Sequence, residues 1–186
     1  APDTVWQSPL YDSWDAARRL EFDPSNRWYR LLCDLTRASV ERAAGKYLVS
    51  GQGFGCVSDV IANMWGSEET LMAMAERPDA VIEATRRLLD ISKRLYDELH
   101  ALVAPCQEGS FDWLYLWAPG RMWSIQSDLC CTISPAMFRD FVLEELRAEA
   151  AHVDDCFYHL DGPGAIKHLD ALLSIEELDG IQWVPG

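Results

Sequence analysis

The chain has 186 residues, 49% of them hydrophobic, and this length supplies one domain with an apolar core but not two. Its 30 acidic and 16 basic side chains leave a formal charge of −14, whose field repels nucleic acids and anionic membranes, so we expect no partner of either kind. Six cysteines without a Cys-x-x-Cys pair, no charged-then-apolar leader and no apolar run near the roughly 20 residues of a membrane span indicate a soluble, cytoplasmic protein with reduced thiols.

Short runs of β-branched and aromatic residues alternate along the chain with amphipathic segments. The first run, residues 46–50, leads into a glycine-rich stretch that contains Gln52 and Phe54. From Asp79 to Leu102 apolar side chains recur every three or four positions, which predicts a long amphipathic helix with a proline in its first turn. The later runs, which we also predict to be strands, are residues 113–117, 123–127, 156–160 and 180–184.

A second helix is predicted to begin after Ser134, whose hydroxyl can cap it, with Pro135 at the first helical position. Apolar side chains recur on one stripe of this helix from Phe138 to Leu146. The outer, solvent-facing side of the helix is then expected to carry Arg139, Glu144, Glu145 and Arg147.

Strands that alternate with helices and end in Gly or Pro turns predict repeated βα units around a parallel sheet. The expected fold class is therefore α/β, a partial (β/α)8 TIM-type barrel with parallel strands. A closed barrel takes about 250 residues, and the sequence supplies about four or five units. The chain also stops one turn after a strand, without the helix that should cover it. We expect residues 1–186 to form a single barrel domain truncated at both ends, with an open sheet edge or a homodimer that covers it.

In such barrels the reactive groups lie at the carboxyl ends of the strands and in the loops that follow them. Eight Trp, six Tyr and six Phe provide flat surfaces for a ring-shaped ligand as well as core packing. The candidate side chains at or near the strand ends are Gln52, Phe54, Asp128, Asp161, Gln182 and Trp183.

Polar residues follow one face of the predicted strand at 123–127. Side chains alternate between the two faces of a strand, so Ser124, Gln126 and Asp128 point to the same side. Buried barrel strands normally carry apolar residues on both faces, so this pattern indicates a wet cavity in which Gln126 binds substrate and Asp128 serves catalysis. The alternative is an edge strand with a solvated outer face.

The same parity places His159 and Asp161 together and Cys156 on the opposite face. A carboxylate beside an imidazole orients the ring and favours its protonated form, so we predict that His159 and Asp161 act as a functional, proton-handling pair. In the alternative, Asp161 shapes the Asp-Gly-Pro turn by bonding its own backbone, and His159 is a structural core residue. On a strand Cys156 and His159 diverge, so we expect no metal site from them.

Two strings at these strand ends resemble a divergent branch of the uroporphyrinogen decarboxylase superfamily. They are Tyr-His-Leu-Asp-Gly-Pro-Gly, from Tyr158 to Gly164, and Ile-Gln-Trp-Val-Pro-Gly, from Ile181 to Gly186. With further likeness around the glycine-rich loop, the resemblance covers most of the chain from about Lys46 onward. It implies a (β/α)8 barrel of which this chain is the middle portion.

The resemblance also implies a cofactor-free decarboxylation of an acidic tetrapyrrole. In such enzymes an electron-rich pyrrole is protonated, an acetate arm loses carbon dioxide into that electron sink, and the remaining carbon is protonated to a methyl group. The protein supplies a carboxylate to the pyrrole N–H groups and cations to the acid arms. This sequence departs from the family where a serine is Asp128 and where a tyrosine is replaced around positions 62 and 63.

Two other functions stay open. The superfamily includes zinc-dependent methyltransferases that move methyl groups between corrinoid proteins and thiols and bind the metal through His-x-Cys. Here His159-Leu160-Asp161 stands in that place, and a carboxylate is less suited than a thiolate to activating a thiol on zinc, although His and Asp together can bind the metal. The third possibility is a non-catalytic binder of a tetrapyrrole or corrinoid. A small molecule is the expected partner, and zinc, a corrinoid and a corrinoid protein belong to the methyltransferase alternative.

Overall fold

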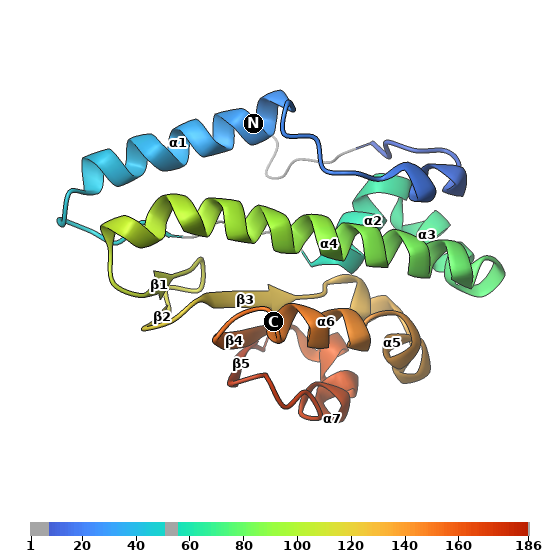
Figure 1. The fold of residues 1–186 in the computed structure, drawn as a ribbon. Helices are drawn as coiled ribbons and strands as arrows, with labels where there is room; N and C mark the ends of the chain where they lie inside the picture. The colour runs from blue at the N-terminus through green and yellow to red at the C-terminus, as the bar shows by residue number, and fades with distance from the viewer. Residues whose placement is uncertain (1–7, 51–55, 186) are drawn as a thin grey trace, which may run out of the picture.

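The computed structural model describes residues 8–50 and 56–185. Most of this part of the chain is helical (Figure 1). The α-helices are α1 (Arg27–Ala43), α2 (Val57–Trp65), α3 (Ser67–Glu76), α4 (Pro78–Val103), α5 (Pro135–Phe141), α6 (Leu143–Ala150) and α7 (Leu169–Leu172). Short 3-10 helices are η1 (Trp14–Arg19), η2 (Ala104–Cys106), η3 (Leu129–Thr132) and η4 (Pro163–His168).

The strands form two separate sheets. A short antiparallel pair consists of β1 (Ser110–Phe111) and β2 (Trp117–Ala118). A parallel sheet consists of β3 (Met122–Gln126), β4 (Asp155–Asp161) and β5 (Gly180–Val184), with β4 in the middle.

The last three predicted strands are confirmed as β3, β4 and β5, whereas the first two predictions are wrong. Residues 46–50 contain no strand, and a side chain takes the place of a strand partner there: the amide of Gln107 accepts from Val49 N at 2.7 Å and donates to Val49 O at 3.2 Å. Residues 113–116 form the turn between β1 and β2, where Asp112 accepts from the backbone N–H of Leu114 and Leu116, and Trp117 begins β2.

The expected α/β class with parallel strands is confirmed at the level of a mixed, mostly helical fold with a small three-stranded parallel sheet. The described residues do not close a barrel. In the same part of the chain the outer edges of β3 and β5 have no strand partner, so the sheet has the open edge that we expected. That a homodimer covers this edge stays a prediction.

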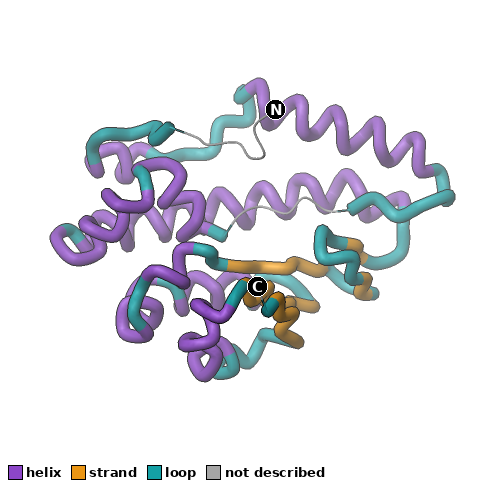
Figure 2. The backbone as a smooth tube through the Cα atoms, turned by 180° about the vertical axis from the view of Figure 1, so that it is seen from behind, coloured by secondary structure: helices purple, strands orange, loops and turns teal. Residues whose placement is uncertain are grey.

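Helices cover one face of the parallel sheet. Figures 1 and 2 show the long helix α4 between α1 and this sheet, and α6 packs on β3 and β4. The sheet residues toward the helices are apolar or aromatic: Trp123, Ile125, Cys156 and Tyr158 are buried. Within the described residues, no helix combines the length and apolarity that a membrane crossing requires. The long amphipathic helix predicted from Asp79 is confirmed as α4.

The predicted cap at Ser134 is confirmed, with Ser134 Oγ accepting from Met137 N at 3.2 Å and Pro135 in the first turn of α5. The helix is divided, because Val142, with φ −118°, separates α5 from α6. Glu145 is buried rather than on the expected outer side, so that prediction is wrong. Buried residues from α5 to α6 are spaced by three or four positions and therefore lie on one stripe, which includes positions 138, 142, 145 and 149.

We expect Ser134→Ala to lower the free energy of unfolding by about 1 kcal/mol, because the first turn of α5 loses the side-chain acceptor for an otherwise unpaired N–H. Urea unfolding followed by circular dichroism measures the loss. The matched control is Ser67→Ala, at the start of α3, where no side chain caps the helix; it should change the value by less than about 0.5 kcal/mol. Equal losses in the two variants are incompatible with the cap.

Candidate functional site

A row of polar side chains crosses the parallel sheet. Gln126 of β3 lies opposite His159 of β4, and His159 lies opposite Gln182 of β5. Residues at matching positions of parallel strands point to the same side of a sheet, so these three side chains share the face opposite the helices. The predicted polar face of β3 and the predicted face of His159 are therefore one surface near the carboxyl ends of the strands.

The ring of His159 is oriented by two neighbours. Its Nδ1 atom is hydrogen-bonded to the amide oxygen of Gln182. An amide oxygen can only accept, so Nδ1 carries a proton and the neutral ring keeps a free electron pair on Nε2. Trp113 packs edge-on against the ring, with 5.2 Å between centroids, and its indole N–H donates to Ser124 O at 3.1 Å. His159 is thereby prepared to accept a proton or an N–H group through Nε2.

Asp161 ends β4 on the same face as His159, as predicted, but Gln182 makes the hydrogen bond to the ring. The turn after Asp161 is held by Gly162, whose N–H donates to Val184 O at 2.9 Å and whose φ of +70° favours glycine. Among the described residues, the Asp161 carboxylate accepts no hydrogen bond from the backbone N–H groups of this turn. That carboxylate is exposed at the strand end.

Asp128 follows β3 and lies within electrostatic range of both β4 residues. Burial raises the pKa of Asp128 above its ordinary value, the charge of Asp161 raises it further, and His159 lowers it. The amide of Gln126 donates to Asp128 Oδ2 at 3.5 Å. Asp161 and His159 are thus close enough to influence the charge of Asp128, the third residue predicted to be catalytic.

Asp59 of α2 is a further carboxylate at this edge. It accepts from Asp128 N at 2.9 Å and from Leu129 N at 2.8 Å, and so fixes the start of η3. Burial raises the pKa of Asp59 to about 6. Asp59 and Asp128 line a pocket of about 250 Å³ together with Asn63 and Thr132. In the sequence Asp59 follows the glycine-rich stretch near a predicted strand end, but no role could be predicted for it, because its contacts join positions 69 and 70 apart and leave no local pattern.

Other predicted site residues are not part of the row. Trp183 lies opposite Leu160 on the other face of the sheet from Gln182, and 51% of it is exposed. Gln52 and Phe54 lie outside the described residues. Cys156 and His159 are on opposite faces, as expected, so they do not converge on a metal.

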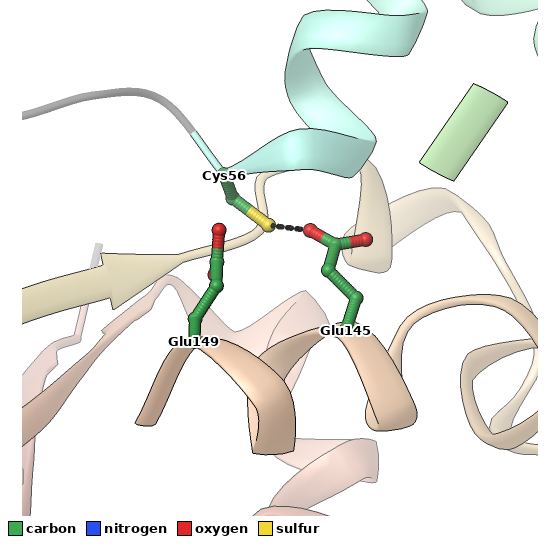
Figure 3. Close-up of side chains that lie close together, drawn as sticks. All are labelled: Cys56, Glu145 and Glu149. Carbon is green, nitrogen blue, oxygen red and sulfur yellow. Dashed lines mark hydrogen bonds between the residues drawn. The ribbon is translucent and has the colours of Figure 1, made fainter. Parts of the chain in front are cut away.

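A second polar cluster lies between the start of α2 and α6 (Figure 3). Cys56, which precedes α2, donates from Sγ to Glu145 Oε1 at 2.7 Å, and the same oxygen accepts from Ser58 N at 3.0 Å. Glu149, one turn along α6, is also fully buried. Burial raises the pKa of Glu145 to about 8 and that of Glu149 well above its ordinary value. The three side chains form the group of potential ligands found in the described residues.

Comparison with known proteins gives no match. No family model, no curated protein and no solved structure is similar to the chain. The role of the strand ends is therefore inferred from their side chains and from the resemblance of the two sequence strings that contain them.

The raised pKa of Asp59 predicts a pH-dependent stability. The folded state holds the proton to higher pH than the unfolded state, so the contribution of Asp59 is fully present below about pH 4 and is lost as the pH rises through about 6. As the pH rises from about 4 to above 6, the wild type loses this contribution and Asp59→Asn does not. Relative to the wild type, the free energy of unfolding of Asp59→Asn should therefore increase by up to about 3 kcal/mol. Urea unfolding of both proteins from pH 4 to 7 measures the difference, and a difference independent of pH contradicts the assignment.

Proposed function

We propose that the strand-end site binds an acidic ring compound of the tetrapyrrole type and catalyses cofactor-free loss of carbon dioxide from one of its acetate arms, as uroporphyrinogen decarboxylases do. We also propose that the parallel sheet is part of a (β/α)8 barrel. The observation that carries the proposal is the in-register row of Gln126, His159 and Gln182, with Asp128 and Asp161 at the ends of β3 and β4.

The donors and acceptors of the row suit such a compound. Pyrrole N–H groups need acceptors, which His159 Nε2 and the carboxylates of Asp128 and Asp161 offer. The amide N–H groups of the glutamines can donate to the oxygens of an acid arm. A cation lies beside the same strand end: Lys167 Nζ donates to Cys131 O at 2.9 Å, and Cys131 Sγ contacts Asp161 O at 3.8 Å.

The proposed reaction requires a proton donor. Asp59 lines the adjacent pocket and burial raises its pKa to about 6, so its protonated carboxyl is the proposed donor just below neutral pH. A proton added to a pyrrole carbon gives a cationic ring. The bond between the methylene carbon and the carboxylate then breaks, its electron pair enters the ring, and carbon dioxide leaves. A second proton, from solvent through the same carboxyl, converts the exocyclic methylene to methyl, and the ring gives the first proton to His159 Nε2, so an acetate arm becomes a methyl group plus carbon dioxide.

The sequence strings from Tyr158 to Gly164 and from Ile181 to Gly186 support this proposal over other barrel chemistries. They supply three of the residues invoked here, His159, Asp161 and Gln182. The methyltransferase alternative gains less support, because the ring of His159 is hydrogen-bonded to Gln182. The group of potential metal ligands found in the described residues, Cys56, Glu145 and Glu149, does not include His159 or Asp161.

A comparison of two incubations tests the proposal. The purified protein is incubated with uroporphyrinogen under reducing conditions, and separately with a methylated corrinoid protein, a thiol and zinc. Carbon dioxide release in the first incubation alone supports decarboxylation. Methyl loss in the second alone replaces the proposal with methyl transfer, and retention of the tetrapyrrole without either reaction replaces it with binding.

A further inference from the structure

We propose that Cys56, Glu145 and Glu149 form a binding site for a zinc-type divalent cation that joins α2 to α6. The proposal is independent of the strand-end chemistry. One atom from each residue lies within 4.8 Å of the other two: the thiol sulfur of Cys56 and one carboxylate oxygen from each glutamate. Figure 3 shows all three side chains pointing into one space between the start of α2 and the side of α6.

The backbone arrangement accounts for this convergence. Glu145 and Glu149 are four residues apart on α6, a spacing that places their side chains one above the other on the same helix face. Cys56 immediately precedes α2 and approaches that face from the opposite side. The site thus uses two rigid helices, and small movements of three side chains are sufficient to bring the donor atoms to a common centre.

Glu149 is the observation that points to a ligand. Its side chain is completely buried, and in the described part of the chain neither carboxylate oxygen has a hydrogen-bond partner. Lys93 of α4 attracts Glu149 through space, but no ion pair joins them among the described residues. A buried carboxylate without a partner is costly and rare, and it aims at the thiol of Cys56 and the carboxylate of Glu145. A cation between the three groups satisfies it.

The donor set selects the class of metal. A thiolate favours zinc over calcium or magnesium, and carboxylates are common additional zinc ligands. Zinc–sulfur bonds of about 2.3 Å and zinc–oxygen bonds of about 2.0 Å at tetrahedral angles place sulfur about 3.5 Å from each oxygen. The 2.7 Å contact between Cys56 and Glu145 therefore opens slightly, and the metal replaces the thiol proton and the protons that the two buried glutamic acids hold, all of which pass to solvent.

The site has a structural consequence for the rest of the molecule. Asp59, which fixes the end of β3, lies three residues after Cys56 on α2. A metal that anchors the start of α2 to α6 also holds Asp59 in position. Metal removal is then expected to loosen the contact between α2 and η3 and to lower the melting temperature.

Zinc binding to the metal-free protein tests the proposal. The exposed thiols of Cys106 and Cys131 are first replaced by serine, so that only buried cysteines remain. Equilibrium dialysis against zinc should give one bound ion per chain, and cobalt(II) should give the near-ultraviolet charge-transfer absorption of a thiolate ligand. In this background Glu149→Gln, which keeps the shape of the side chain, should weaken zinc binding at least tenfold. Glu144→Gln, on the exposed side of the same helix, should leave it unchanged.

The site is overturned if the background protein binds no zinc. It is also overturned if Glu149→Gln leaves the zinc affinity unchanged. Circular dichroism confirms that the glutamine variant is folded. Cobalt bound by the background protein without the thiolate absorption also overturns the site, because Cys56 is then not a ligand.

Discussion

If the proposed function holds, we expect His159→Gln to lower the release of carbon dioxide from uroporphyrinogen about a hundredfold or more and to change the melting temperature by only a few degrees. A positioned acid or base contributes about 10²–10⁴ to a rate, and glutamine has no group that gains and loses a proton near neutral pH. His159 is only half-buried and packs at the open face of the sheet, so little core packing is lost. Turnover and thermal melts of the same preparations measure the two effects.

Asp161→Asn is the companion variant, and it should also lower turnover with little loss of stability, because the described hydrogen bonds of the turn run through the backbone of Gly162. His100→Gln is the control, since His100 lies on α4 beside Tyr96 and away from the row. If the variants at 159 and 161 melt lower yet keep full turnover, the two residues are scaffold and the site assignment is wrong.

Trp65→Ala is expected to lower the free energy of unfolding by about 3–5 kcal/mol, the largest stability effect that we predict. Trp65 is 2% exposed, stacks on Trp14 at 4.6 Å with 5° between the rings, and donates from its indole N–H to Ser13 O at 3.0 Å. Its removal leaves a large cavity and an unpaired carbonyl, and it releases the segment before α1 from α2.

The matched control is Trp28→Ala on α1, where 63% of the side chain is exposed and Arg27 covers the ring at 4.3 Å. That change should cost less than about 1 kcal/mol. Urea unfolding of both variants provides the comparison. Equal losses at Trp65 and Trp28 contradict the placement of Trp65 in the core.

Local patterns in the sequence are sufficient for the parallel sheet and for α4. Strand parity placed Gln126 on a polar face of its strand and His159 with Asp161, and the structure joins these residues with Gln182 in one surface. The period of the apolar residues likewise gave α4. These features follow from side-chain periods of two and 3.6, which act within one element.

The features that sequence could not supply depend on contacts between distant segments. Gln107 replaces a strand partner for Val49 across 58 positions, and Asp59 reaches Asp128 across 69. Residues 113–117 have the composition of a strand, but residues 113–116 form a turn that Asp112 holds through its carboxylate. Glu145 looks solvent-facing beside Glu144, and its burial follows from the packing of α6 against the start of α2.

Nitrogen NMR of the four histidines, in protein labelled with ¹⁵N, tests most directly whether the polar row of the sheet is the ligand site. In the free protein the account predicts a His159 ring with the proton on Nδ1 and a free pair on Nε2, and His159→Gln assigns its signals. Addition of uroporphyrinogen should shift His159 Nε2 strongly and leave the rings of His100, His152 and His168 near their original positions. An unchanged His159 in a protein that binds the compound contradicts the central claim, because the ligand then lies elsewhere.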